Sequence, residues 1–168
     1  MNWEAFGAIG EVVGAIAVVF TIAYLAIQVR QNTLALRSAA TLGATDEVTH
    51  IYHTLSTDPE LAMIFVRGSA VFDELNDSQV ARFHSFYMMI SFSAQNWYFQ
   101  TRDGLIEESL LASWTRLMQQ AATAPGFQRF WHDRRFVFAP EFQKWIEAEV
   151  FGKASKVVYK PLGVGGSQ

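Results

Sequence analysis

The sequence predicts an all-α protein: one N-terminal transmembrane helix that continues into a cytoplasmic helical bundle. Residues 5–29 are apolar except for Glu11, Thr21, Tyr24 and Gln28. A helix over this range reaches roughly 37 Å, which is enough to cross a hydrocarbon core of about 30 Å. After this stretch, apolar residues recur at helical spacing and no alternating strand pattern is present.

Composition and charge narrow the classes of function. The net charge is −3 and no basic stripe is present, which argues against nucleic acid as a partner. The sequence has no cysteine, which removes disulfides, thiolate catalysis and cysteine-ligated metals.

A signal peptide is the alternative to a span, but it needs positive charge before an apolar run of about 7–15 residues. Here Arg30 and Arg37 follow the run, so the positive-inside rule places the C-terminal side in the cytoplasm.

Four segments follow from this interpretation. We expect a short outer N-terminus over residues 1–4, a span over residues 5–29 and a helical bundle over residues 30–151. Residues 152–168 are rich in glycine and lysine, which is typical of a flexible tail.

One face of the span consists of small residues. Gly7, Gly10, Gly14 and Ala17 recur at steps of three and four, so they share a helix face. Small residues let backbones approach closely in lipid, although glycine and alanine are also common in spans without this role. Glu11 lies beside this face, either in the hydrocarbon with a partner or in the headgroup region. These five residues form the predicted oligomer interface.

The helix is expected to continue through the membrane boundary until Asp58 and Pro59, which are typical of a helix cap and a first helical turn. It carries a seam at four-three spacing, much of it small and polar, which suits either close packing between copies or a partly wet stalk: Leu34, Ser38, Thr41, Thr45, Val48, Tyr52 and Leu55.

Capping and breaking residues divide the remaining chain. The second helix runs from Pro59 to about Gly68, and Asn76 with Gln79 resembles a capping box that starts a third, buried helix. Asp103-Gly104 ends that helix. We expect further helices over residues 106–122, 127–135 and 140–151. Predicted core residues are Val80, Phe83, Phe86, Tyr87, Met89, Ile90, Phe92, Ala94 and Trp97, then Leu110, Trp114, Leu117 and Met118, then Phe130, Trp131, Phe138, Phe142, Trp145 and Ile146.

The arrangement of several short motifs resembles a widespread group of bacterial single-span membrane proteins with a C-terminal helical domain. The matching segments are Gly7–Glu11, Tyr24–Asn32, Asp58–Ala62, Asn96–Tyr98, Gly104-Leu105, Trp114, Pro125-Gly126, Phe130-Trp131 and Arg134-Arg135 with Phe138. The resemblance covers most of the chain to about Phe151. It implies a membrane-tethered domain in the bacterial inner membrane, and it implies no activity.

Two polar groupings are candidates for chemistry. Glu47, His50 and His53 are spaced by three, so neighbours share a helix face and two could reach one transition metal, with His84 as a ligand from another helix. Paired-metal bundles use such a motif on each of two helices, whereas this chain has one, and an exposed polar face explains it equally. Asn96 is either a ligand-binding residue or a buried amide bonded to a loop carbonyl.

Two classes of function remain open. The first is a non-enzymatic, membrane-anchored interaction or assembly protein, which needs no cofactor and associates with itself or with a larger membrane complex. The second is a tethered enzyme domain that binds a metal or small ligand through Glu47, His50 and His53. No nucleophile–base pair, phosphate loop or dinucleotide motif is visible in the sequence.

Overall fold

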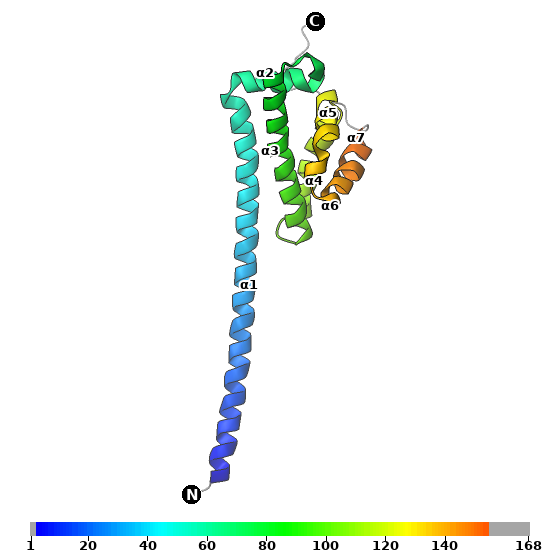
Figure 1. Ribbon diagram of the computed structural model, residues 1–168. Coiled ribbons are helices and arrows are strands. Elements are labelled where there is room, and N and C mark those ends of the chain that lie inside the picture. Colours follow the sequence, from blue (N-terminus) through cyan, green and yellow to red (C-terminus); the bar gives the residue numbers. More distant parts are fainter. Residues whose placement is uncertain (1–2, 155–168) are drawn as a thin grey trace. The chain divides into compact units, whose positions relative to one another are not determined.

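The computed structural model describes residues 3–154 and contains no strand in this part of the chain (Figure 1). Residues 1–2 of the predicted N-terminus and residues 155–168 of the predicted tail lie outside the described residues, as do the side chains of residues 3–6, 8 and 9. The prediction of an all-α fold is confirmed. The elements are α1 (Trp3–Thr57), α2 (Pro59–Ala70), η1 (Phe72–Glu74), α3 (Asp77–Arg102), α4 (Glu108–Ala121), α5 (Pro125–Arg134), η2 (Arg135–Val137), α6 (Pro140–Trp145), η3 (Ile146–Phe151) and α7 (Gly152–Ala154).

The chain divides into two compact units, residues 1–39 and residues 40–168, and α1 contributes to both. In the first unit every side chain from Gly10 to Ala39 is exposed. Among the described residues, α1 alone is long and apolar enough to cross a membrane. The predicted long apolar helix is therefore present, and nothing within the first unit covers it.

Local capping explains where the helices of the second unit begin and end. Asp58 caps α2 because its Oδ1 accepts a hydrogen bond from the Leu61 backbone N–H at 2.9 Å, and Pro59 occupies the first turn. Asn76 and Gln79 form the predicted capping box of α3, with reciprocal bonds of 3.0 and 3.1 Å. After α3, Gly104 takes a φ of 72°, a conformation that favours glycine.

The predicted four-three seam of α1 lies beside the stripe that faces the core of the second unit. Thr41, Thr45 and Tyr52 are exposed, Val48 and Leu55 are partly buried, and Ala44 and Ile51 are the α1 residues buried in the second unit. The stripe around Ala44 and Ile51 is turned by roughly a quarter of a turn from the seam, and packing between copies along the seam stays a prediction. Residues at four-three spacing form two neighbouring stripes on this helix. The stripe that packs against the bundle is the one that contains Ala44, whose small side chain permits close approach.

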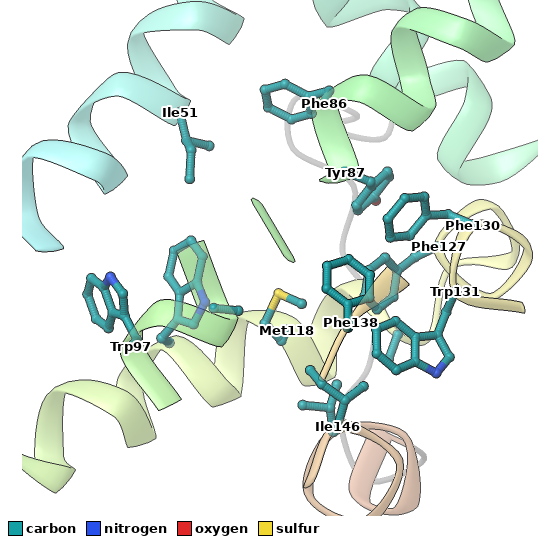
Figure 2. Close-up of a cluster of buried hydrophobic side chains, with 14 of the residues drawn as sticks. Ile51, Phe86, Tyr87, Trp97, Met118, Phe127, Phe130, Trp131, Phe138 and Ile146 are labelled. Atoms are coloured by element: carbon teal, nitrogen blue, oxygen red, sulfur yellow. The ribbon is translucent and has the colours of Figure 1, made fainter. Parts of the chain in front are cut away.

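The core of the second unit is an aromatic cluster between α3, α5 and the segments that follow. Figure 2 shows Phe127, Phe130, Trp131 and Phe138 from the C-terminal segments gathered near Tyr87 of α3. Tyr87 and Phe127 have ring centroids 5.0 Å apart, and Trp131 stacks on Phe138 at 5.5 Å. Ring pairs in such geometries add about 0.5–1.5 kcal/mol each beyond the area that they bury.

Several predicted core residues lie farther out. Leu117 and Phe92 are each 46% exposed, and the others are partly buried: Val80, Met89, Ile90, Leu110 and Trp145. Leu117 follows the helical period of α4, but Trp114 and Met118 already fill the side of that helix that faces the core. Phe92 lies beside the core residue Phe138, with ring centroids 5.1 Å apart.

Two glycines from different helices, Gly68 and Gly126, form a close backbone contact in the bundle. Gly68 lies within α2 and Gly126 lies in the first turn of α5. A Cβ atom added to Gly126 would lie 2.0 Å from the carbonyl oxygen of Gly68, and one added to Gly68 would lie 2.6 Å from Cδ2 of Phe83. The backbones of α2 and α5 therefore touch, with the Phe83 ring against both.

The C-terminal end differs from the single helix predicted over residues 140–151. After α6 the backbone widens into a π-helical segment, η3, and α7 then extends helical structure to Ala154. The predicted flexible tail therefore begins too early, since Gly152–Ala154 are helical. Near α5 the helix starts at Pro125, two residues before the predicted start, because proline fits the first helical turn.

We expect Gly126→Ala to lower the free energy of unfolding by at least about 3 kcal/mol, the upper end of overpacking effects, because its methyl group would overlap a backbone carbonyl that cannot rotate away. Denaturant unfolding in detergent, followed by near-UV circular dichroism, measures this change. Gly43→Ala is the matched control. A Cβ at Gly43 meets nothing within 4 Å, so this change should stabilise the helix by about 0.5–1 kcal/mol. Equal stability of the two variants would contradict the contact.

Candidate functional site

The predicted oligomer interface is uncovered on the single chain. Gly7, Gly10, Glu11, Gly14 and Ala17 are exposed, and a Cβ atom added to any of the three glycines would meet nothing within 4 Å. The space that small residues leave for a second backbone is therefore open, and the oligomer interface stays a prediction.

Polar side chains in the apolar stretch are satisfied within the helix, with one exception. Thr21 donates to the Ala17 carbonyl at 2.8 Å, and Gln28 donates to the Tyr24 hydroxyl at 2.6 Å. Such local bonds make polar groups tolerable in an apolar environment. Glu11 makes no hydrogen bond or ion pair with any described residue. It is the one polar group of this stretch whose partner must come from elsewhere.

The Glu47 carboxylate joins α1 to α3. Its Oε1 accepts a hydrogen bond from Asn96 Nδ2 at 3.0 Å, and its Oε2 accepts one from Trp97 Nε1 at 3.1 Å. The Asn96 carbonyl oxygen accepts from Gln100 at 2.8 Å. The prediction that Asn96 is buried and bonded to a loop carbonyl is wrong: the residue is exposed, and its amide bonds a carboxylate. Sequence spacing within one helix gave no sign of this contact between two helices.

The candidate metal ligands are not gathered at one point. His50 and His53 are exposed on α1, and Glu47 turns towards Asn96. His84 lies twelve residues before Asn96 on α3, roughly 18 Å away along the helix axis. No group of three or more histidine, aspartate or glutamate side chains among residues 3–154 is placed to hold one metal ion.

His84 is a buried histidine in an aromatic and cationic environment. Its ring stacks on Phe72 with centroids 5.6 Å apart and meets the edge of Phe130 at 5.7 Å. Arg134 Nε donates to His84 Nδ1 at 3.4 Å, so Nδ1 is unprotonated and the neutral ring carries its proton on Nε2. Within the described residues, buried Nε2 has no hydrogen-bond partner.

Burial and the neighbouring Arg134 guanidinium lower the pKa of His84 below its usual value, and Arg129 adds to this shift. Asp133 opposes it, but Asp133 is itself paired with Arg129 and His132 at 2.9 and 3.0 Å. The histidine is thus held neutral by its surroundings, which is a structural property of the junction between α3 and α5.

A cavity of about 550 Å³ lies where α3, α4 and the α6–η3 segment meet. We call it the α4 pocket. Its lining includes Tyr98, Glu108, Arg116, Trp145 and Glu149, none of which the sequence marked as a site. The available signal was the spacing of Glu108, Ala112 and Arg116, which places them on one face of a single helix. The spacing within α4 alone does not show that α3 and the α6–η3 segment lie against that face.

No family model matches the chain, and no curated protein and no solved structure is significantly similar to it.

Replacing Glu47 by alanine should lower the free energy of unfolding by about 1–3 kcal/mol, because the Asn96 and Trp97 donors lose a charged acceptor. Asp46→Ala removes the neighbouring carboxylate, which is exposed and forms no hydrogen bond or ion pair with a described residue, and should change stability by less than about 0.5 kcal/mol. Thermal unfolding of the two variants in parallel makes the comparison. Equal melting temperatures would mean that the Glu47 contact contributes nothing.

The free energy of unfolding should fall as the pH drops below about 6.5, the ordinary pKa of histidine. The pKa of His84 is lower in the folded state than in the unfolded state. As the pH falls, His84 therefore binds a proton in the unfolded chain before it does so in the folded chain, and this favours unfolding. His84→Phe keeps the ring stacking and should flatten this pH dependence, whereas His50→Gln, at an exposed histidine, should leave it unchanged. Parallel pH profiles of wild type and His84→Phe would disprove the assignment.

Proposed function

We propose that this protein is a membrane-anchored, non-enzymatic assembly protein whose copies pack against one another along α1. The observation that carries the proposal is the uninterrupted exposure of α1 from Gly10 to Ala39, over a stretch long and apolar enough to span a bilayer. Exposed apolar area on this scale needs a lipid or protein partner.

The proposed anchor is residues 5–29 in a bacterial inner membrane, with the helical bundle in the cytoplasm. Arg30 and Arg37 immediately follow the apolar stretch and support this orientation. The hydrogen bonds that Thr21 and Gln28 make within the helix suit a hydrocarbon environment, where no water replaces a missing partner. The resemblance to bacterial single-span proteins, proposed from short motifs, agrees with this placement.

Within the membrane, the face of Gly7, Gly10 and Gly14 is the proposed contact between copies. Each glycine leaves open space where a Cβ would stand, so two backbones can approach closely enough for dense packing in lipid. Glu11 lies at the edge of this face and makes no hydrogen bond or ion pair with any residue from 3 to 154. In an oligomer, neighbouring Glu11 side chains would share a proton or hydrogen bonds in place of facing lipid.

Below the membrane, the four-three seam supports the same arrangement. Thr41, Thr45 and Tyr52 keep the spacing of a packed helix face, yet they are exposed because the bundle uses the neighbouring stripe of α1. In the sequence, steps of three and four connect these positions back to Gly10 and Ala17. A parallel helix from a second copy would cover both faces.

A larger membrane complex in which α1 contacts a different protein is the alternative partner for the same surface. The tethered metal enzyme has less support, since Glu47 is engaged by Asn96 and Trp97 and the histidines lie apart.

The double variant Gly10→Leu, Gly14→Leu should dissociate the oligomer while leaving the bundle folded, because two isobutyl groups would hold the backbones apart. Light scattering coupled to chromatography in detergent measures the protein mass of each form. Ala15→Leu, Ala23→Leu adds similar volume to the other side of the helix and should keep the wild-type mass. If wild type and the glycine variant have the same mass, this face is not the assembly interface.

Protease treatment of sealed inner-membrane vesicles tests the anchor and its orientation. With the cytoplasmic side inside, the bundle should be protected until detergent opens the vesicles. Cleavage of the bundle in sealed vesicles of that orientation would overturn the proposed topology, and release of the chain by alkaline carbonate would overturn the anchor.

A further inference from the structure

The α4 pocket combines an apolar floor with charged ends, an arrangement that the assembly function does not use. Tyr98 and Trp145 pack together, with ring centroids 5.2 Å apart, and line it together with Leu111. Its volume of about 550 Å³ falls in the usual range of small-ligand sites, about 300–1,000 Å³.

Most charges around the pocket are already neutralised by the chain itself. Arg102 is paired with Asp103 at 3.0 Å and with Glu141 at 2.9 Å, and Glu149 is paired with Lys153. Two charges remain. Arg116 bonds only the Ser113 hydroxyl, at 2.9 Å, and Glu108 makes no hydrogen bond or ion pair with any residue in the described part.

The two remaining charges are opposite in sign and lie on the same side of α4. Their positions are two turns apart, about 12 Å along the helix axis. An extended chain spans about 3.3–3.6 Å per residue, so a tripeptide of roughly 10–11 Å can reach both side chains with its termini. The ammonium group would meet Glu108 and the carboxylate would meet Arg116.

The wall of the pocket includes one polar group without a partner. The Thr101 hydroxyl on α3 is buried and has no hydrogen-bond partner among residues 3–154, although buried hydroxyls usually have one. Gln119, also in the lining, donates to the Glu149 carbonyl of the π-helical segment at 2.8 Å. Segments of this kind, with irregular backbone bonding, are frequent at functional sites.

We propose that the α4 pocket binds a short zwitterionic peptide of three residues. Glu108 holds the amino terminus, Arg116 holds the carboxylate, and a central apolar side chain lies over Leu111 and Trp145. The site belongs to the second unit alone. It is therefore independent of assembly through α1, and either proposal can fail without the other.

Isothermal titration of the full-length protein in detergent tests the proposal with the tripeptide Ala-Leu-Ala, its N-acetylated form and its C-terminal amide. Each modification removes one terminal charge, and each should weaken binding to wild type about tenfold. Arg116→Gln should bind the free acid and the amide equally. Glu108→Gln should bind the free and acetylated amines equally.

Two matched variants control for net charge. Glu107→Gln and Lys144→Gln change neighbouring charges that do not line the pocket, and both should keep the wild-type preference for free termini. Unfolding curves of all four variants establish that the bundle is intact. The proposal is overturned if wild type does not bind Ala-Leu-Ala at millimolar concentration. It is equally overturned if Arg116→Gln and Glu108→Gln keep the tenfold preferences.

Discussion

The bundle depends on a contact that contains no side chain on either helix. At Gly68 and Gly126 the backbones of α2 and α5 meet, and the Phe83 ring of α3 packs against the same point. This contact brings α2, α3 and α5 together, because the Phe83 ring lies 2.6 Å from the position that a Gly68 Cβ would take and 2.9 Å from that of a Gly126 Cβ. A methyl group at either glycine would separate helices that the aromatic cluster needs close together. The dense packing of the rings therefore follows from the absence of two Cβ atoms.

Features determined by neighbouring residues could be predicted from the sequence. The Asp58 cap, the Asn76–Gln79 capping box and the glycine after α3 each depend on interactions within a few residues, and each is present as expected. Features determined by a residue that is far away in the sequence could not be predicted in this way. The sequence showed a helical period in α1. Which side of α1 faces the bundle depends on which stripe fits α3, and in the structure Ala44 and Ile51 are buried there whereas Thr41 and Thr45 are exposed. The pairing of Glu47 with Asn96 was invisible for the same reason, as was the role of Gly68 and Gly126 in one contact.

The polar residues of the second unit divide into those that hold the fold and those that remain free. Arg82 pairs with both Asp58 and Glu60 and so ties α3 to the turn between α1 and α2. Glu47 ties α1 to α3, and Arg134 lies against His84 between α3 and α5. These residues explain why several conspicuous charges in the sequence need no ligand. Arg116 and Glu108 are different, because the charges around them are paired whereas these two form no ion pair within residues 3–154.

The position of Gly126 late in the chain has a consequence for biosynthesis. Domains generally fold as units when their sequence has left the ribosome, and helices form faster than contacts between distant segments. Glu47 can pair with Asn96 only after a further 49 residues have been synthesised, and the contact between α2 and α5 requires a longer segment still. Until Pro125 and Gly126 emerge, the nascent chain presents Phe83 and Tyr87 without their cover, next to an apolar helix that has already been completed. The window between the synthesis of α3 and that of α5 is thus the stage at which apolar side chains of the second unit stay exposed for longest and at which aggregation competes with folding.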